Sequence, residues 1–311
     1  MTQNVPTDRD SILITAESLA EQLRTERALH TEPTLPTEPP LPAAAPRTRL
    51  LDVRWSLPQP VGRAAFAEGH IPGAVYVDLD TELARHGNAQ AAHDPRDGRH
   101  PLPHTAQFQA AARSWGLREQ DQVVAYDGGG NLAAARVWWL LRNAGFERVR
   151  LLDGALPAWA AAGYPLETGA SAPTPGDVTL DPGQLATLDL ADVAEFVASG
   201  GTLLDARASE RFTGETEPID PRAGHIPGAR SAPTTGNLDG TGRFLDGAAL
   251  RERFAGAGVT DDSGVAAYCG SGITASHTVV ALALAGYDAA LFPGSWSQWS
   301  NHAELPVATG P

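Results

Sequence analysis

The hexapeptide GHIPGA occurs twice in this chain, at residues 69–74 and at residues 224–229. LLDVR (50–54) precedes the first copy as LLDAR (203–207) precedes the second, and VVAYDGGGN (123–131) is echoed by VAAYCGSGI (265–273). Similar segments in the same order and at nearly constant spacing indicate an internal duplication. We therefore predict two copies of one domain, spanning residues 10–165 and 184–308 and joined by a linker over residues 166–183.

Short runs rich in valine and leucine alternate with longer helical patterns inside each copy. Examples are the runs 123–126 and 149–152, with a helical pattern over 132–144 between them. This alternation predicts an α/β fold in which each domain is a parallel sheet with helices on both faces. Such sheets carry their sites beyond the carboxyl ends of the strands. The proline-rich stretch 30–49 is expected to be a solvated insertion without an assigned role.

The composition narrows the classes of function. The chain has 311 residues, a net charge of −14 and one cysteine. That charge argues against nucleic acid and anionic membrane surfaces as partners, because both attract basic patches. The lone cysteine excludes an internal disulfide, and we expect no metal site. Because we see neither a signal peptide nor an apolar run of about 18 residues, we expect a cytoplasmic protein.

The lone cysteine, Cys269, directly follows a predicted strand and precedes a predicted helix. Gly270 and Gly272 allow the backbone to turn tightly around the sulfur, so that amides of the helix N-terminus can face it. Thiols in that setting ionise near neutral pH. We therefore expect Cys269 to be a nucleophile, although a buried cysteine can also serve as a small apolar residue. The first copy has Asp127 at this position and is expected to be inactive.

The paired GHIPGA motifs, the D-x-R after a strand and the loop CGSGITA (269–275) resemble the two-domain rhodanese family of sulfurtransferases. A loop reading Cys-Gly-Ser-Gly is most similar to that of 3-mercaptopyruvate sulfurtransferases. The resemblance implies that sulfur passes from a small-molecule donor to the cysteine as a persulfide, with release of pyruvate. A thiol, thioredoxin or cyanide then accepts the sulfur, and no cofactor is needed.

The resemblance also implies the remaining site residues. Arg211 and Arg222 would hold the substrate carboxylate. His100 and Asp80, from the first copy, would form a polar relay with Ser271 that protonates the pyruvate enolate. The other residues expected to line the donor site lie in the cysteine loop: Gly270, Gly272, Ile273 and Thr274.

Other repeated residues are better explained by structure. His70 and His225 occur in both copies, including the copy without a nucleophile, so we expect them to stabilise turns. Arg54 and Arg207 are expected to form internal ion pairs. The tryptophans are expected to pack in the core and interfaces.

Three alternative functions are weighed against mercaptopyruvate sulfur transfer. A cysteine phosphatase would need an arginine six positions after the cysteine, where this chain has Ala275. Thiosulfate sulfurtransferase remains an alternative, although a dianionic donor favours cations in the loop, and this loop has none. A non-catalytic sulfur carrier or scaffold would keep the fold without turnover.

Overall fold

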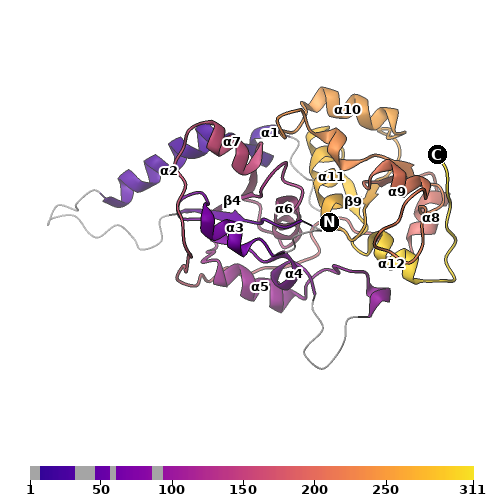
Figure 1. The fold of residues 1–311 in the computed structure, drawn as a ribbon, viewed down its shortest axis with the longest axis horizontal. Coiled ribbons are helices and arrows are strands. Elements are labelled where there is room, and N and C mark those ends of the chain that lie inside the picture. Colours follow the sequence, from indigo (N-terminus) through magenta and orange to yellow (C-terminus); the bar gives the residue numbers. More distant parts are fainter. Residues whose placement is uncertain (1–7, 32–45, 57–60, 86–93) are drawn as a thin grey trace.

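The computed structural model describes residues 8–31, 46–56, 61–85 and 94–311. Within them, the two sequence copies form two halves that lie side by side along the long axis of the molecule (Figure 1). Most of the predicted insertion 30–49 falls outside the described residues.

The first half contains a sheet in the order β1-β5-β4-β2-β3, in which every pairing is parallel. Its elements in chain order are α1 (Arg9–Ile12), β1 (Leu13–Ile14), α2 (Ala16–Thr31), β2 (Thr48–Asp52), α3 (Arg63–Glu68), β3 (Val75–Tyr76), α4 (Leu79–Glu82), the 3-10 helix η1 (Pro95–Asp97), α5 (Thr105–Ser114), β4 (Gln122–Tyr126), α6 (Ala134–Asn143), β5 (Val149–Leu152) and α7 (Ala155–Ala161).

The second half repeats this plan with a parallel sheet in the order β7-β6-β8-β9. Its elements are α8 (Val193–Ala198), β6 (Thr202–Asp205), α9 (Ser209–Thr213), β7 (Arg230–Ser231), the 3-10 helix η2 (Thr234–Asn237), α10 (Gly247–Gly256), β8 (Val265–Tyr268), α11 (Ile273–Leu284), β9 (Ala289–Leu291) and α12 (Ser295–Asn301). The expected α/β class, with helices on both faces of each sheet, is confirmed.

Alternate residues of each strand enter different cores. In β4, Val124 and Tyr126 pack towards α2 and α7, whereas Val123 and Ala125 join an apolar cluster that continues into the second half. The strand period of two explains this division. One apolar core is therefore shared by both domains.

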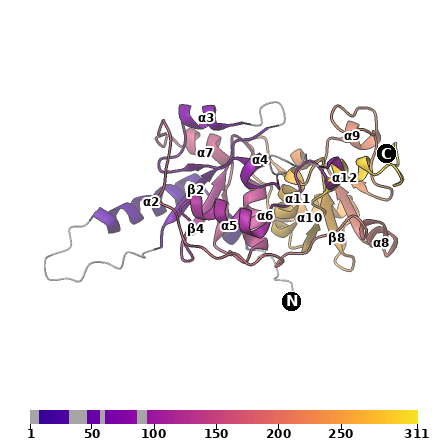
Figure 2. The same cartoon turned by 90° about the horizontal axis from the view of Figure 1, so that it is seen from below.

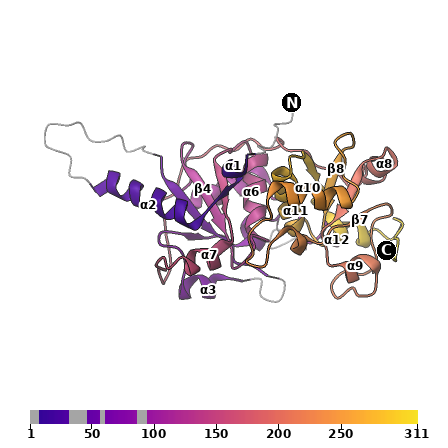
Figure 3. The same cartoon turned by 90° about the horizontal axis from the view of Figure 1, so that it is seen from above.

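Helices α6 and α11 meet at the centre of this shared core, and Figures 2 and 3 show them side by side from opposite directions. Trp138 and Trp139 of α6 are fully buried, as are most residues of α11. Each of these helices follows the central strand that carries Asp127 or Cys269. Packing α6 on α11 therefore brings the two loops that begin at these residues to the domain junction.

The connection between the domains is packed rather than free. Val178 and Leu180, in the predicted linker, are buried in the shared core, and the amide of Val178 donates to the carbonyl of Leu117. No helix in the described part of the chain is both long and apolar enough to cross a bilayer.

The repeated residues support equivalent turns in both domains, as expected. The ring Nδ1 of His70 lies 2.8 Å from the Phe66 carbonyl, and that of His225 lies 2.8 Å from the Phe212 carbonyl. Each imidazole stacks on the same phenylalanine whose carbonyl it contacts. These contacts assign both histidines to the fold.

The expected ion pairs are also confirmed. Arg54 contacts Asp52 at 2.7 Å, and Arg207 contacts Asp205 at 2.6 Å. Each arginine also donates to a carbonyl just before the GHIPGA histidine, from Gly69 or Gly224. The pairs therefore tie the first strand of each repeat to its GHIPGA turn.

Arg207→Met tests how much the ion pair with Asp205 contributes to stability, because it leaves the fully buried Asp205 carboxylate without its arginine partner. We expect the free energy of unfolding, measured in urea, to fall by about 3–5 kcal/mol. The control Arg251→Met breaks an exposed pair with Asp261 and should cost about 0–1 kcal/mol. Equal losses in the two variants would contradict this assignment.

Candidate active site

Cys269 lies where β8 ends and the turn into α11 begins. Its side chain is buried, yet it lines a cavity of about 240 Å³. The amide of Gly272 donates to Sγ at 3.2 Å, and the Cys269 amide donates to Oγ of Ser295 at 3.1 Å. The sulfur therefore faces both a backbone donor and a cavity.

The loop around this sulfur requires glycine at one position. Gly272 has a φ of +82°, and a Cβ atom there would lie 2.4 Å from the carbonyl oxygen of Pro293. The first turn of α12 fastens the loop from the other side, because Trp296 N–H donates to the Cys269 carbonyl and Ser297 N–H to the Gly270 carbonyl. Contacts with the segment that follows β9 therefore fix the loop. Of the helix N-terminal amides expected to face the sulfur, that of Gly272 is the one that donates to it among the described residues.

The relay residues predicted from the sequence come together beside this loop. Nδ1 of His100 lies 2.7 Å from Oγ of Ser271, and Nε2 lies 3.3 Å from a carboxylate oxygen of Asp80. Because a carboxylate only accepts, Nε2 carries the proton and Nδ1 accepts from the Ser271 hydroxyl. Trp55 donates to the same Asp80 oxygen at 3.0 Å and meets the His100 ring edge-on.

The buried position of His100 favours its neutral form. Burial lowers the pKa of the imidazole, against the opposing effect of the Asp80 carboxylate. Of the other histidines in the expected region, His104 is the exposed residue that precedes α5 and its side chain makes no capping hydrogen bond, and His93 lies outside the described residues. His100 is therefore the described histidine of this region that reaches the cysteine loop.

Arg211 also lines the cavity, as do the predicted residues Gly270, Ile273 and Thr274. Its guanidinium is held by two buried carboxylates, Glu217 at 2.7 Å and Asp220 at 3.1 Å. Burial raises the pKa of Glu217, but hydrogen bonds from Arg211 and two backbone amides lower it, and the net shift is downward. Both partners of the ion pair are therefore charged, and the guanidinium is fixed at the cavity wall.

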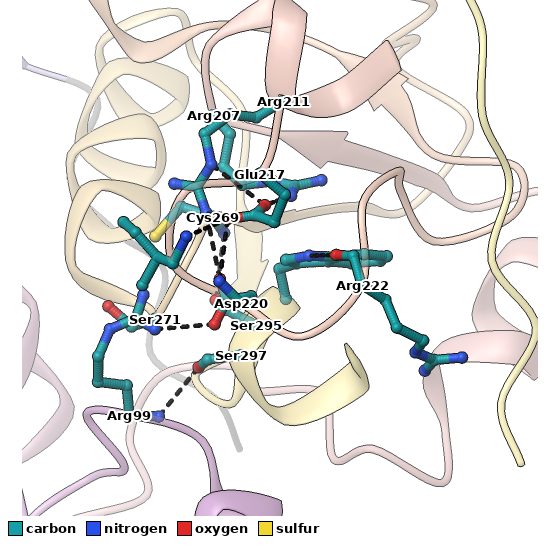
Figure 4. Close-up of polar contacts among 12 residues, drawn as sticks. Arg99, Arg207, Arg211, Glu217, Asp220, Arg222, Cys269, Ser271, Ser295 and Ser297 are labelled. Carbon is teal, nitrogen blue, oxygen red and sulfur yellow. Dashed lines mark hydrogen bonds and ion pairs between the residues drawn. The ribbon is translucent and has the colours of Figure 1, made fainter. Parts of the chain in front are cut away.

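Arg222 does not join them, which corrects its expected placement at the donor site. Its guanidinium points away from Cys269 (Figure 4) and is absent from the cavity lining. It donates instead to four carbonyls that surround the end of α12, those of Trp299, Ser300, His302 and Leu305. A guanidinium saturated by backbone oxygens anchors this chain segment.

A family comparison agrees with the duplicated architecture and the cysteine loop. The family model described as a rhodanese-like domain matches residues 41–162 and 189–302. The chain belongs to the rhodanese family. Cys269 lies in the second matched domain, and Asp127 has the equivalent position in the first.

Relatives of this rhodanese cover almost its whole length. A Mycobacterium tuberculosis protein named putative thiosulfate sulfurtransferase SseB is 43% identical, over 97% of this chain and 98% of the relative. A Pseudomonas aeruginosa protein named probable 3-mercaptopyruvate sulfurtransferase is 45% identical, over 85% and 93%. The structure of the 3-mercaptopyruvate sulfotransferase SseA from Escherichia coli matches with a TM-score of 0.74 at 29% identity, over 91% and 98%. The chain is a sulfurtransferase. The names of its relatives differ in the sulfur donor, which is thiosulfate for one and 3-mercaptopyruvate for the other two.

Arg136, on α6 of the first rhodanese domain, is a residue that the sequence reasoning missed. Its fully buried guanidinium donates to the carbonyls of His100 at 2.9 Å and Gly272 at 3.2 Å. Burial lowers its pKa to about 10, and attraction to Cys269 acts in the opposite direction. Arg136 therefore remains a cation at neutral pH, between the relay and the cysteine loop.

Ser295 and three residues of the first domain were also missed. Ser295, which holds the Cys269 amide, has a φ of +54°, and Ala155 has the same φ at the equivalent place in the first copy. A serine in one copy and an alanine in the other is a signal that could have revealed it. Trp55, Arg99 and Leu132 line the cavity from the first domain, and no repeat pattern marks them.

Asp127 occupies the position in the first domain that Cys269 has in the second. Its carboxylate accepts backbone N–H bonds from Gly129, Asn131, Ala133 and Ala134, at 2.8–3.3 Å. In the first domain, the amides of this loop therefore bind the carboxylate of Asp127, which belongs to the loop itself.

The described residues contain no group of three or more His, Cys, Asp or Glu suited to a metal ion.

Asp127 should make the stability of this rhodanese depend on pH. Burial raises its pKa from 3.8 to about 6, although the four amides act in the opposite direction. The proton is therefore bound more tightly in the folded state, so this contribution to stability is complete below pH 3.8 and is lost as the pH rises through about 6. Relative to Asp127→Asn, the free energy of unfolding should fall by up to about 3 kcal/mol over this range. Parallel pH profiles of the two proteins, measured by urea unfolding, would exclude this effect.

Proposed function

We propose that the protein transfers sulfur from 3-mercaptopyruvate to a thiol acceptor through a persulfide on Cys269. Three features that meet at one cavity support this proposal: the Cys269 sulfur with its Gly272 amide, the Ser271–His100 contact, and the Arg211 guanidinium. A small thiol, thioredoxin or cyanide would serve as acceptor. The sulfur atoms carry the chemistry, so the mechanism does not call for a cofactor.

In the first half-reaction, the Cys269 thiolate attacks the sulfur of the donor and an S–S bond forms. The C–S bond breaks, and its electron pair leaves on carbon as the enolate of pyruvate. The proton of the donor thiol passes through Ser271 and His100 to the methylene carbon, which becomes the methyl group of pyruvate. The enzyme retains the transferred atom as a persulfide. In the second half-reaction, the acceptor attacks the outer sulfur and regenerates the thiolate.

The observation that carries the choice of donor is the 2.7 Å contact between Ser271 Oγ and His100 Nδ1. Sulfite, the leaving group from thiosulfate, is a stable anion and needs no proton. The enolate from mercaptopyruvate must gain a proton. A proton relay that begins two residues after the nucleophile is therefore required for the enolate leaving group and not for sulfite. The balance of arginines and carboxylates at the cavity favours a donor with one carboxylate over a dianion.

Thiosulfate sulfur transfer is the second candidate. The Mycobacterium tuberculosis relative, which matches nearly the full length of this chain, is named a putative thiosulfate sulfurtransferase. A sulfur carrier without turnover would use the same cysteine loop but would not need the relay. The three functions, which are sulfur transfer from mercaptopyruvate, sulfur transfer from thiosulfate and sulfur carriage without turnover, therefore predict different turnover rates with the two donors.

The deciding experiment measures kcat/KM for both donors, following pyruvate release from mercaptopyruvate and sulfite release from thiosulfate. We expect mercaptopyruvate to be preferred by at least about tenfold, which corresponds to about 1.4 kcal/mol of transition-state binding. Cys269→Ser should abolish both reactions, because an alcohol is far less ionised than a thiol. A preference for thiosulfate would reject the proposed donor, and absence of turnover with either would favour the carrier.

His100→Gln provides a second test, since it removes the acceptor of the Ser271 proton. We expect kcat/KM for mercaptopyruvate to fall by about 10²–10⁴-fold, with little change for thiosulfate. Because burial lowers the pKa of His100 below its ordinary 6.5, the neutral relay persists into mildly acidic solution. In the wild type, kcat/KM for mercaptopyruvate should fall at low pH as His100 gains a proton, and this fall should lie below pH 6.5. The fall should be missing from His100→Gln. An acid limb shared by both proteins would argue against the relay.

A further inference from the structure

Arg99 reaches the active site from a loop of the first domain whose place is fixed by the second. Its main-chain N–H donates to Oγ of Ser297 at 2.9 Å. The preceding Gly98 has a φ of +86°, and a Cβ atom there would lie 2.8 Å from the Gly294 carbonyl oxygen. Gly294 adjoins Ser295, which holds the Cys269 amide. The loop is therefore fitted against the segment that supports the nucleophile.

The buried carboxylate of Asp220 joins Arg99 to Arg211. Nη1 of Arg99 donates to one of its oxygens at 2.8 Å, and Nη2 of Arg211 donates to the other at 3.1 Å. Figure 4 shows Asp220 between the two arginines, which come from different domains. One carboxylate therefore sets the spacing of two guanidiniums at the domain junction.

Each of these guanidiniums keeps one terminal nitrogen for another partner. Among the described residues, neither Nη2 of Arg99 nor Nη1 of Arg211 has a hydrogen-bond acceptor. A Cβ atom placed on Gly270 would lie 3.3 Å from the first nitrogen and 3.5 Å from the second. Both nitrogens therefore converge on the same small space, one residue from Cys269.

Charge points to what this space accepts. The cavity lining contains Arg99, Arg207 and Arg211, and these three are paired with three carboxylates, Asp205, Glu217 and Asp220. A carboxylate that enters the cavity meets two terminal nitrogens without acceptors among the described residues, and it displaces no existing ion pair. A planar carboxylate has two oxygens, so each guanidinium can donate a charge-assisted hydrogen bond to one of them.

We propose that Arg99 is a substrate-binding residue, which together with Arg211 clamps the carboxylate of the sulfur donor between the two domains. The clamp rests on the proposed function, since it names the group of the donor that this site holds. Asp220 is its positioning residue. The first domain then contributes to donor binding as well as to the proton relay.

Alkylation of Cys269 tests the clamp without any sulfur transfer. Iodoacetate carries a carboxylate, whereas iodoacetamide attacks the same sulfur as a neutral reagent of nearly the same size. Loss of a charge-assisted hydrogen bond worth about 1.5–3 kcal/mol predicts that Arg99→Met lowers the rate with iodoacetate by about tenfold or more. The rate with iodoacetamide should stay within about twofold of the wild type, which also reports that the folded site is intact.

The chain offers matched variants. Arg96→Met removes an exposed arginine from the same loop, where its contacts are with His302 and Glu304, and should leave the ratio of the two rates unchanged. Arg211→Met should lower the ratio as Arg99→Met does. Asp220→Asn should also lower the ratio, because an amide has one acceptor oxygen and no charge with which to hold both guanidiniums.

Several results would overturn the clamp. One is a fall in both alkylation rates by the same factor in Arg99→Met, and another is an unchanged ratio. An unchanged KM for mercaptopyruvate in Arg99→Met would also overturn it. If instead the ratio changes while the enzyme does not turn over mercaptopyruvate, the two arginines bind a carboxylate beside Cys269, but the proposed donor is wrong and the clamp is not a donor site.

Discussion

A buried cation between the two domains is the constraint on which the active site depends. Arg136 comes from the first domain, yet its guanidinium donates to the carbonyl of Gly272 in the cysteine loop of the second domain and to that of His100. Among the described residues it forms no ion pair with a carboxylate, although it is fully buried. An uncompensated buried charge is costly, and burial lowers the pKa of Arg136 to about 10 against an opposing attraction to Cys269. The packing of α6 on α11 and the chemistry of the sulfur are thus coupled through one side chain.

The duplicated fold uses the same turn for opposite purposes. In the first domain the turn closes around the carboxylate of Asp127, which four amides satisfy. In the second, one amide reaches the sulfur of Cys269, and a cavity replaces the remaining contacts. The first domain contributes to the site of the second, because Arg99 lines the cavity and His100, with Asp80, contacts Ser271 of the cysteine loop.

The sequence was sufficient for those parts of the site that lie within one short segment or repeat. The loop that begins at Cys269 has a local cause, since glycine is required where φ is positive and a carbonyl approaches closely. His70 and Arg207 could be assigned to the fold because both copies contain their counterparts. Arg222 could not be placed, because no local pattern distinguishes a guanidinium that binds substrate from one that binds the carbonyls at a helix end.

The order of residues alone determined the duplication and the α/β class, and it predicts Cys269 as the nucleophile and a first copy that has none. Those features follow from periodicity, spacing and glycine geometry, which act over a few residues. Only the tertiary structure decided which distant groups meet around the cysteine loop: Arg99 and Arg211 on Asp220, Arg136 on the Gly272 carbonyl, and Ser295 on the Cys269 amide. The physical reason is that these contacts join segments from two domains, and their distances are set by the packing of the shared apolar core.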